Sequence, residues 1–140
     1  MNGLHRILVV EDEPSLRRLV ARTVQSALPQ CSITEAADGL EAAGLLETLT
    51  PSVVIMDLRM PGMDGFELCR LIRQRWPDGP ATVIAMTGET TAHNVDEIRR
   101  AGAAACLLKP FDLDELVGHV QAALTHLNGA TSTNRPVARG

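Results

Sequence analysis

Residues 53–62, VVIMDLRMPG, contain the clearest structural signal in the chain. The first four residues are apolar without interruption and three of them are β-branched, as expected for a strand that helices cover on both faces. Asp57 follows the run directly, and a Pro-Gly pair then ends it in a turn. Strands of this kind belong to parallel sheets, so the segment predicts an α/β domain with Asp57 at one edge of its sheet.

Four other short apolar runs lie at residues 6–10, 31–36, 82–86 and 104–108. The runs at 6–10 and 82–86 are continuously apolar, whereas 31–36 alternates with polar residues and suits an edge strand. Longer segments with apolar residues at helical spacing separate the runs. This alternation predicts (βα)5, a doubly wound parallel five-stranded sheet with right-handed crossovers and a strand order such as 2-1-3-4-5.

The predicted helices have recognisable starts. Pro14 suits the first position of the first helix, and Asp38, Asp64 and Asp112 can cap the second, third and fifth. The fourth, at about residues 92–101, has few large apolar residues. For the first helix, helical spacing predicts a buried stripe of Leu16, Leu19, Val20, Val24 and Ala27.

The composition is that of one globular domain, with 140 residues, 45% of them apolar and 21% charged. We expect one folded domain over residues 4–128 and a flexible tail, or the start of a linker, over residues 129–140.

The net charge of −4 gives no positive field for nucleic acid or an anionic membrane, and no apolar run suits a signal peptide or membrane span. We therefore expect a cytoplasmic protein. Cys31, Cys69 and Cys106 show no metal-type spacing, which predicts unreactive thiols in a reducing compartment.

Polar residues of types used in catalysis and ligand binding follow four of the five apolar runs. In an open parallel sheet, ligands bind outside the carboxyl ends of the strands. The residues at these ends are Glu11 and Asp12 after the first run, Asp57 after the third, Thr87 after the fourth and Lys109 after the fifth. A strand order with the first and third strands side by side brings Glu11, Asp12 and Asp57 into one cleft.

Three carboxylates in one cleft repel each other, and a hard divalent cation bound through oxygen relieves this repulsion. Magnesium is the first candidate, because it uses few protein ligands and leaves positions for water and phosphate oxygens. A hydroxyl at Thr87 and an ammonium at Lys109, the only lysine among 13 basic residues, would complete a site for a phosphoryl group. Each residue alone has an ordinary explanation as a cap, a turn or a solvated loop. Their occurrence together at four strand ends favours the phosphoryl site.

Four segments closely resemble the receiver domain of two-component response regulators: ILVVEDEP at 7–14, VIMDLRMPGMDG at 54–65, AMTG at 85–88 and LLKPF at 107–111. The resemblance extends from about residue 6 to residue 127. It implies a flavodoxin-like fold and a receiver domain over residues 4–128. It also implies transfer of a phosphoryl group onto Asp57 from a histidine kinase or a histidine phosphotransfer protein.

The resemblance further implies a site for Mg²⁺ or Mn²⁺. Glu11 and Asp12 match the acidic pair of the family, with Asp12 as a direct ligand and Glu11 acting through water. Asp57 and the main-chain carbonyl of Arg59 complete the implied ligand set. The family more commonly has aspartate at the position of Glu11, and the extra methylene is compatible with metal binding.

Thr87 and Lys109 match the residues that contact the phosphoryl oxygens, and Pro110 matches a proline that usually follows a cis peptide bond. These matches imply that Asp57 is a nucleophile whose acyl phosphate is slowly hydrolysed by water. The domain would then catalyse its own phosphorylation and dephosphorylation, without being a multiple-turnover enzyme on an external substrate.

Phosphorylation would favour a state in which one face repacks, formed by segments 92–101 and 104–108 and the last helix. This face is the implied site for a downstream protein partner or for a self-dimer. Cys106 lies on it, where the family usually has tyrosine or phenylalanine as a switch coupled to Thr87. Either Cys106 is an ordinary small buried residue, or segment 92–101 shifts into the space left by the missing ring and so reports the movement of Thr87.

Two further hypotheses concern charged side chains. Arg59 and Glu89 lie two residues after Asp57 and Thr87, where they could pair across the mouth of the site and restrict the attacking water. The arginines of the first and third predicted helices are expected on solvated faces rather than in a nucleic-acid patch. These arginines are Arg17, Arg18, Arg22, Arg70, Arg73 and Arg75.

Two other functions fit part of the pattern. A pseudo-receiver would keep the fold and bind a protein without phosphate; the complete set of strand-end residues speaks against it, whereas Cys106 leaves it open. A magnesium-dependent phosphatase of the haloacid dehalogenase type would need a second aspartate two residues after the nucleophile, where this chain has Arg59. It would also need room for a cap domain.

Overall fold

The computed structural model describes residues 5–79, 81–88 and 92–132 of the chain. Its strands form one parallel sheet in the order β2-β1-β3-β4-β5. The strands are β1 (Arg6–Val10), β2 (Ser32–Ala36), β3 (Val53–Asp57), β4 (Thr82–Thr87) and β5 (Ala103–Leu108). The helices are α1 (Pro14–Ala27), α2 (Gly39–Leu45), α3 (Gly65–Arg75), α4 (Ala92–Arg100) and α5 (Leu113–Ser132). The predicted (βα)5 class and strand order are confirmed.

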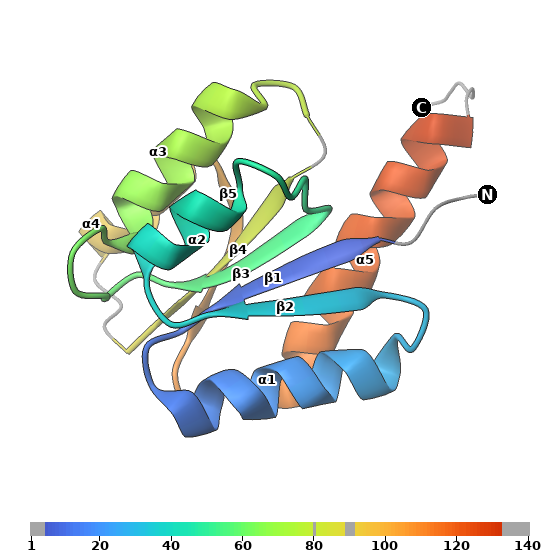
Figure 1. The fold of residues 1–140 in the computed structure, drawn as a ribbon, viewed down its shortest axis with the longest axis horizontal. Helices are drawn as coiled ribbons and strands as arrows, with labels where there is room; N and C mark the ends of the chain where they lie inside the picture. The colour runs from blue at the N-terminus through green and yellow to red at the C-terminus, as the bar shows by residue number, and fades with distance from the viewer. Residues whose placement is uncertain (1–4, 80, 89–91, 133–140) are drawn as a thin grey trace.

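Helices cover both faces of the sheet, with α1 and α5 on one face and α2, α3 and α4 on the other (Figure 1). Alternate residues of β1 divide between the two cores. Ile7 and Val9 pack with α1 and α5, whereas Leu8 and Val10 pack with the helices of the opposite face. This burial on both faces explains the unbroken apolar runs of the central strands.

Side chains at the predicted positions cap the helices. Asp38 and Asp112 accept main-chain N–H groups from the first turns of α2 and α5 at 2.8 and 3.0 Å. Asp64 and Glu67 form a reciprocal capping box at the start of α3. Pro14 is the first residue of α1, as predicted. Each cap fixes the point where the chain leaves a strand end and begins a helix.

The predicted buried stripe of α1 is only partly right. Val20 and Val24 are buried, together with Ala21, but Leu19 is 49% exposed and Ala27 is also exposed. The predicted stripe covers a wider arc of the helix than the sheet and α5 can contact. The covered arc is centred on the line from Val20 to Val24, which turns Leu19 towards solvent.

The pairing of β5 with β4 contains an irregularity that the sequence did not indicate. Val83 pairs with Ala103 and Ile84 pairs with Ala105, so the register shifts by one residue between these pairs. After the shift, Ala105 faces the core of α1 and α5, and Cys106 packs against the core of α2, α3 and α4. Cys106 is therefore half-buried on the side of the sheet that α4 covers.

Helix α5 continues to Ser132, four residues beyond the domain boundary predicted at residue 128. The first proline after the start of α5 is Pro136, so no residue before it lacks the N–H that helix continuation needs. The rest of the predicted tail, residues 133–140, lies outside the described residues. Within the described residues, no helix combines the length and apolar character that a membrane span requires.

Candidate functional site

The carboxyl ends of β1 and β3 lie side by side, because Val10 pairs with Met56. The next residue along each strand direction carries a carboxylate, Glu11 after β1 and Asp57 at the end of β3. Ligand oxygens of Glu11, Asp12 and Asp57 all lie within 4.8 Å of one another. The sheet topology thus brings together the three carboxylates that the sequence analysis places in one cleft.

Lys109 lies between two of these carboxylates. Its Nζ donates to Glu11 Oε1 and to Asp57 Oδ2, both at 2.9 Å. Glu11 and Asp57 are 1% and 5% exposed, whereas Asp12 is exposed. We call Glu11, Asp12, Asp57 and Lys109 the carboxylate pocket. Three carboxylates and one ammonium leave two formal negative charges there.

Main-chain N–H groups hold the other oxygens of the two buried carboxylates. The N–H of Glu13 donates to Glu11 Oε2 at 3.0 Å, and the N–H of Arg59 donates to Asp57 Oδ1 at 3.2 Å. Each buried carboxylate therefore accepts hydrogen bonds on both oxygens, which fixes its orientation. Asp12 is the member of the pocket most open to solvent.

Burial and charge act in opposite directions on the ionisable groups of the pocket. Burial raises the pKa of the Glu11 carboxyl above its usual value, and hydrogen bonds from Glu13 and Lys109 only partly offset this effect. Burial alone would lower the pKa of Lys109, but the contacts with Glu11 and Asp57 outweigh it and raise that pKa. The lysine consequently keeps its proton and supplies a permanent positive charge beside Asp57.

The other two predicted residues, Thr87 and Lys109, lie at the carboxyl ends of β4 and β5, on the same side of the fold as the pocket. Thr87 ends β4, is 1% exposed, and lies one residue beyond Met86, the partner of Asp57 across the sheet. The carbonyl of Thr87 accepts the main-chain N–H of Lys109 at 2.7 Å. The Lys109–Pro110 peptide bond is cis, as the resemblance implied.

Two glycines shape the loop between β3 and α3. Gly62 has a φ of +77°, a left-handed backbone conformation that residues other than glycine rarely adopt. A Cβ at Gly65 would lie 2.7 Å from the carbonyl oxygen of Asp57 and 2.7 Å from the Cα of Leu58. Glycine at position 65 thus lets the start of α3 approach the main chain at the end of β3 closely.

The donor set of the pocket fits a hard divalent cation. Such cations take carboxylate and carbonyl oxygens, and the three carboxylates offer oxygens close enough to share one ion. The single ammonium of Lys109 leaves the pocket negative, and the exposed Asp12 gives access from solvent. Arg59 lies beside this set through its N–H contact with Asp57, and the role predicted for its carbonyl stays a prediction.

Two predictions about arginines have different outcomes. Arg17 was predicted on a solvated face, but its side chain is only 15% exposed and donates to the main-chain carbonyl of Glu11 at 3.0 Å. Helical spacing could have revealed it, because residue 17 lies one turn before Val20 and Ala21 on the covered arc of α1. The hypothesis that Arg59 pairs with Glu89 cannot be compared with a contact, because Glu89 lies outside the described residues.

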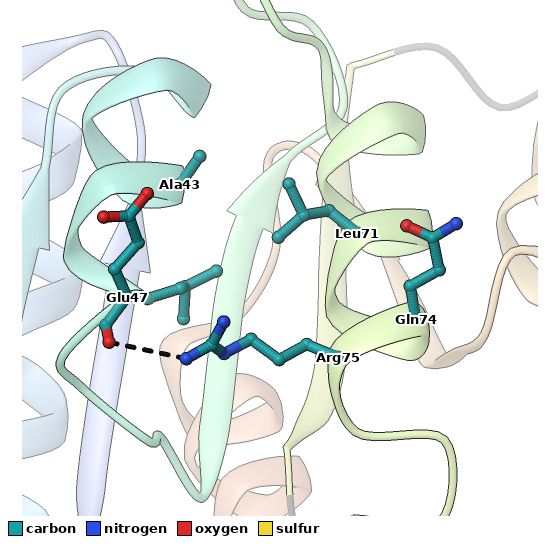
Figure 2. Close-up of a pocket in the computed structure, with 6 residues that line it drawn as sticks. Ala43, Glu47, Leu71, Gln74 and Arg75 are labelled. Atoms are coloured by element: carbon teal, nitrogen blue, oxygen red, sulfur yellow. Dashed lines mark hydrogen bonds between the residues drawn. The ribbon is translucent and has the colours of Figure 1, made fainter.

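A second hollow lies between α2 and α3, with a volume of about 470 Å³. We call it the α2–α3 groove; it is lined by Ala43, Leu46, Glu47, Leu71, Gln74 and Arg75. Figure 2 shows the guanidinium of Arg75 reaching across the groove to the main-chain carbonyl of Glu47, at 3.4 Å. The charged side chains that line it, Glu47 and Arg75, are exposed.

A buried aspartate paired with lysine, beside two further carboxylates at the strand ends of a (βα)5 sheet, defines a receiver domain. Comparison with protein families agrees, since the family described as "Response regulator receiver domain" matches residues 7–121. The chain belongs to this family, and the resemblance found in the sequence is confirmed. It is accordingly a domain of two-component signalling.

Individual relatives are similar over most of this chain. The DNA-binding transcriptional regulator NtrC of Escherichia coli K12 is 38% identical over 120 residues, which are 86% of this chain and 25% of NtrC. Protein-glutamate methylesterase/protein-glutamine glutaminase 4 of Myxococcus xanthus is 42% identical over 76% of this chain and 30% of its own length. The signal receiver domain of a DNA-binding response regulator from Colwellia psychrerythraea has a TM-score of 0.80 and 33% identity, covering 86% of this chain and 98% of that domain. This chain thus spans about a quarter to a third of the two curated relatives.

Proposed function

We propose that this domain is a phosphorylation-controlled signalling switch in which Asp57 accepts a phosphoryl group from a histidine kinase or a histidine phosphotransfer protein. One observation carries the proposal: the buried carboxylate of Asp57 accepts a hydrogen bond from Lys109 Nζ at 2.9 Å and lies in a cluster of three carboxylates. A buried carboxylate with a fixed cation and excess negative charge suits phosphoryl transfer, because that reaction depends on positioning and on neutralising charge.

In the proposed transfer, a carboxylate oxygen of Asp57 attacks the phosphorus of a phosphohistidine. The new P–O bond forms as the P–N bond breaks, and the imidazole leaves with the electron pair of that bond. Lys109 neutralises charge on a phosphoryl oxygen, and the hydroxyl of Thr87 donates to another. Later attack by water releases inorganic phosphate and regenerates the carboxylate, which makes dephosphorylation a slow reaction of the domain itself.

The transfer is proposed to depend on Mg²⁺, with Mn²⁺ as a substitute. Asp12, Asp57 and the carbonyl of Arg59 would bind the ion directly, and Glu11 would act through water. When bound, the ion neutralises negative charge on the transferring phosphoryl group. The chain's own residues position the nucleophile, since the N–H of Arg59 holds Asp57 Oδ1 at 3.2 Å.

The surface beside Lys109 suits the docking of the phosphodonor protein. A hollow of about 410 Å³ is lined by Lys109, Leu16, Leu19, Pro110, Phe111 and Leu113. Leu19, which is 49% exposed, contributes with the other apolar residues of this lining to an exposed apolar surface. Because Lys109 lines this hollow and also contacts Asp57, a helix that carries phosphohistidine and packs here would present its phosphorus to the pocket.

The output surface is proposed to be the face of α4, β5 and α5, used by a downstream protein partner or by a second copy of the chain. Leu108 of β5 is 47% exposed on this face, and half-buried Cys106 adjoins it. Since Cys106 leaves more space than an aromatic ring, a shift of α4 towards β5 is the proposed response to phosphorylation. The net charge of −4 favours a protein partner over nucleic acid or membrane, and a cytoplasmic location suits a phosphohistidine donor.

Intact mass spectrometry tests the proposed function. The protein is incubated with acetyl phosphate, with and without Mg²⁺, alongside the variant Asp57→Asn. We expect a gain of one phosphoryl group that requires Mg²⁺ and is absent from the variant. If the wild type gains no phosphate from acetyl phosphate or from a phosphohistidine donor, the domain is a phosphorylation-independent pseudo-receiver and the proposal is wrong.

A further inference from the structure

Arg17 links three parts of the fold that meet beside the carboxylate pocket. From the first turn of α1, its Nη1 donates to the main-chain carbonyl of Glu11 at 3.0 Å, and its Nε donates to Glu35 Oε1 on β2 at 3.1 Å. The main-chain N–H of Arg17 also donates to the carbonyl of Glu13 at 2.9 Å. At 15% exposure, the side chain is far more buried than is usual for arginine on a surface helix.

These contacts fix the peptide unit that joins Glu11 to Asp12. The carbonyl of Glu11 and the N–H and Cα of Asp12 belong to one planar unit, so holding the carbonyl oxygen also sets the direction in which the chain enters Asp12. On its other side, the N–H of Glu11 donates to the carbonyl of Ala36 at 3.1 Å. Of the three clustered carboxylates, the exposed Asp12 is the one whose placement depends most on its own main chain.

The position of Arg17 is unfavourable on electrostatic grounds alone. A guanidinium beside a site for a cation repels that cation. Glu35 offsets this repulsion through its contact with Nε, while Nη1 remains available to the carbonyl of Glu11. A half-buried, charge-paired arginine that donates to the backbone of a metal-site loop is expected if its directional hydrogen bonds matter more there than its charge.

We propose that Arg17 is a positioning residue that orients the Glu11–Asp12 peptide unit, and with it the Asp12 carboxylate, for binding a divalent cation. Glu35 acts through Arg17 by holding its guanidinium in place. The inference rests on the metal site of the proposed function, and it assigns to α1 and to the edge strand β2 a part in that site.

The sign of the effect of Arg17→Met on Mg²⁺ affinity separates positioning from charge. Isothermal titration calorimetry with MgCl₂ on the unphosphorylated protein gives the dissociation constant without any phosphoryl transfer. Methionine keeps most of the aliphatic stem and removes the donors and the charge. If Arg17 orients Asp12, the dissociation constant rises about tenfold. If charge dominates, it falls, because a neighbouring cation has been removed.

Arg18→Met is the matched control, since Arg18 is the next residue of α1 and is exposed. It removes the same charge from the same helix and is expected to leave the Mg²⁺ dissociation constant unchanged or slightly lower. Arg17→Lys, which keeps the charge but cannot reproduce both donor contacts, is expected to weaken binding to an intermediate extent and covers the case in which Arg17→Met does not fold.

Glu35→Gln completes a double-mutant cycle with Arg17→Met. Because Glu35 acts through Arg17, its substitution should weaken Mg²⁺ binding in the wild type and have no further effect in the Arg17→Met background. A dissociation constant of folded Arg17→Met or Arg17→Lys equal to or below that of the wild type would overturn the inference while leaving the proposed function intact. Absence of Mg²⁺ binding by the wild type itself would overturn the metal site and the inference together.

Discussion

The carboxylate pocket and the α2–α3 groove show two ways in which this fold forms a hollow. In the pocket, Lys109 contacts Glu11 and Asp57, which precede it in the chain by 98 and 52 positions. Both charged contacts are partly buried and have N···O distances of 2.9 Å. In the groove, exposed Arg75 reaches Glu47 with one hydrogen bond of 3.4 Å over a core that includes Leu46. The groove is a space left between two helices, whereas the pocket is a convergence of charges that the sheet topology enforces. Chemistry is therefore expected where buried charges converge, as at Glu11, Asp57 and Lys109.

The largest expected contrast is in phosphorylation. Lys109→Met removes the ammonium that neutralises charge beside Asp57, so the rate of phosphorylation by acetyl phosphate should fall at least about 100-fold. Arg75→Met removes a cation from the groove and should change that rate by less than about twofold, because an exposed charge outside the site contributes little to it. Time courses of intact mass measure both rates; equal losses in the two variants would contradict a special role for the pocket.

The next contrast is in stability. Leu46 is 1% exposed beneath the groove, so Leu46→Ala should lower the free energy of unfolding by about 2 kcal/mol, at the low end for such changes because the adjoining hollow lets the site relax. Urea denaturation measures the loss. Mg²⁺ affinity of the folded variant should equal that of the wild type; a reduced affinity would show that the groove and the pocket are energetically coupled.

Metal binding should depend on the exposed carboxylate of the pocket. Asp12→Asn removes one of three charges and one proposed ligand, so the Mg²⁺ dissociation constant should rise about tenfold, while metal-free thermal stability stays equal or increases as repulsion is relieved. Calorimetric titration and thermal melting give the two quantities. Unchanged Mg²⁺ affinity in this variant would exclude Asp12 as a ligand.

The smallest expected effect is the loss of the hydrogen bond across the groove. Arg75 is exposed, donates to Glu47 at 3.4 Å and lies over the ring of Trp76 at 5.3 Å. Arg75→Met should lower the free energy of unfolding by less than about 0.5 kcal/mol, since exposed contacts of charged side chains contribute little. A loss above about 2 kcal/mol in urea denaturation would mean that the groove is held together by this contact.

Most of the fold could be predicted because the signals were local. The apolar runs gave the strands, Asp38 and Asp64 marked helix starts, and the residues following the strands gave the composition of the pocket. The resemblance supplied roles for these residues, which the geometry of Glu11, Asp57 and Lys109 suits.

The features that could not be predicted depend on packing between distant segments. The outward position of Leu19 is set by how α1 rests on the sheet, and the register shift opposite Val83 and Ile84 is set by the pairing of β4 with β5. The contact of Arg17 with Glu35 requires knowing that α1 crosses the end of β2. Helical spacing places Arg17 on the covered arc of α1, but it does not identify Glu35 on β2 as the partner of its guanidinium.

Peptide mapping after borohydride reduction tests whether the phosphoryl group resides on Asp57. Protein treated with acetyl phosphate and Mg²⁺ is reduced, which converts an aspartyl phosphate to homoserine, and its peptides are sequenced by tandem mass spectrometry. We expect homoserine at position 57 and an unmodified aspartate at position 12. Unmodified Asp57 together with a phosphoryl group on another residue would contradict this expectation.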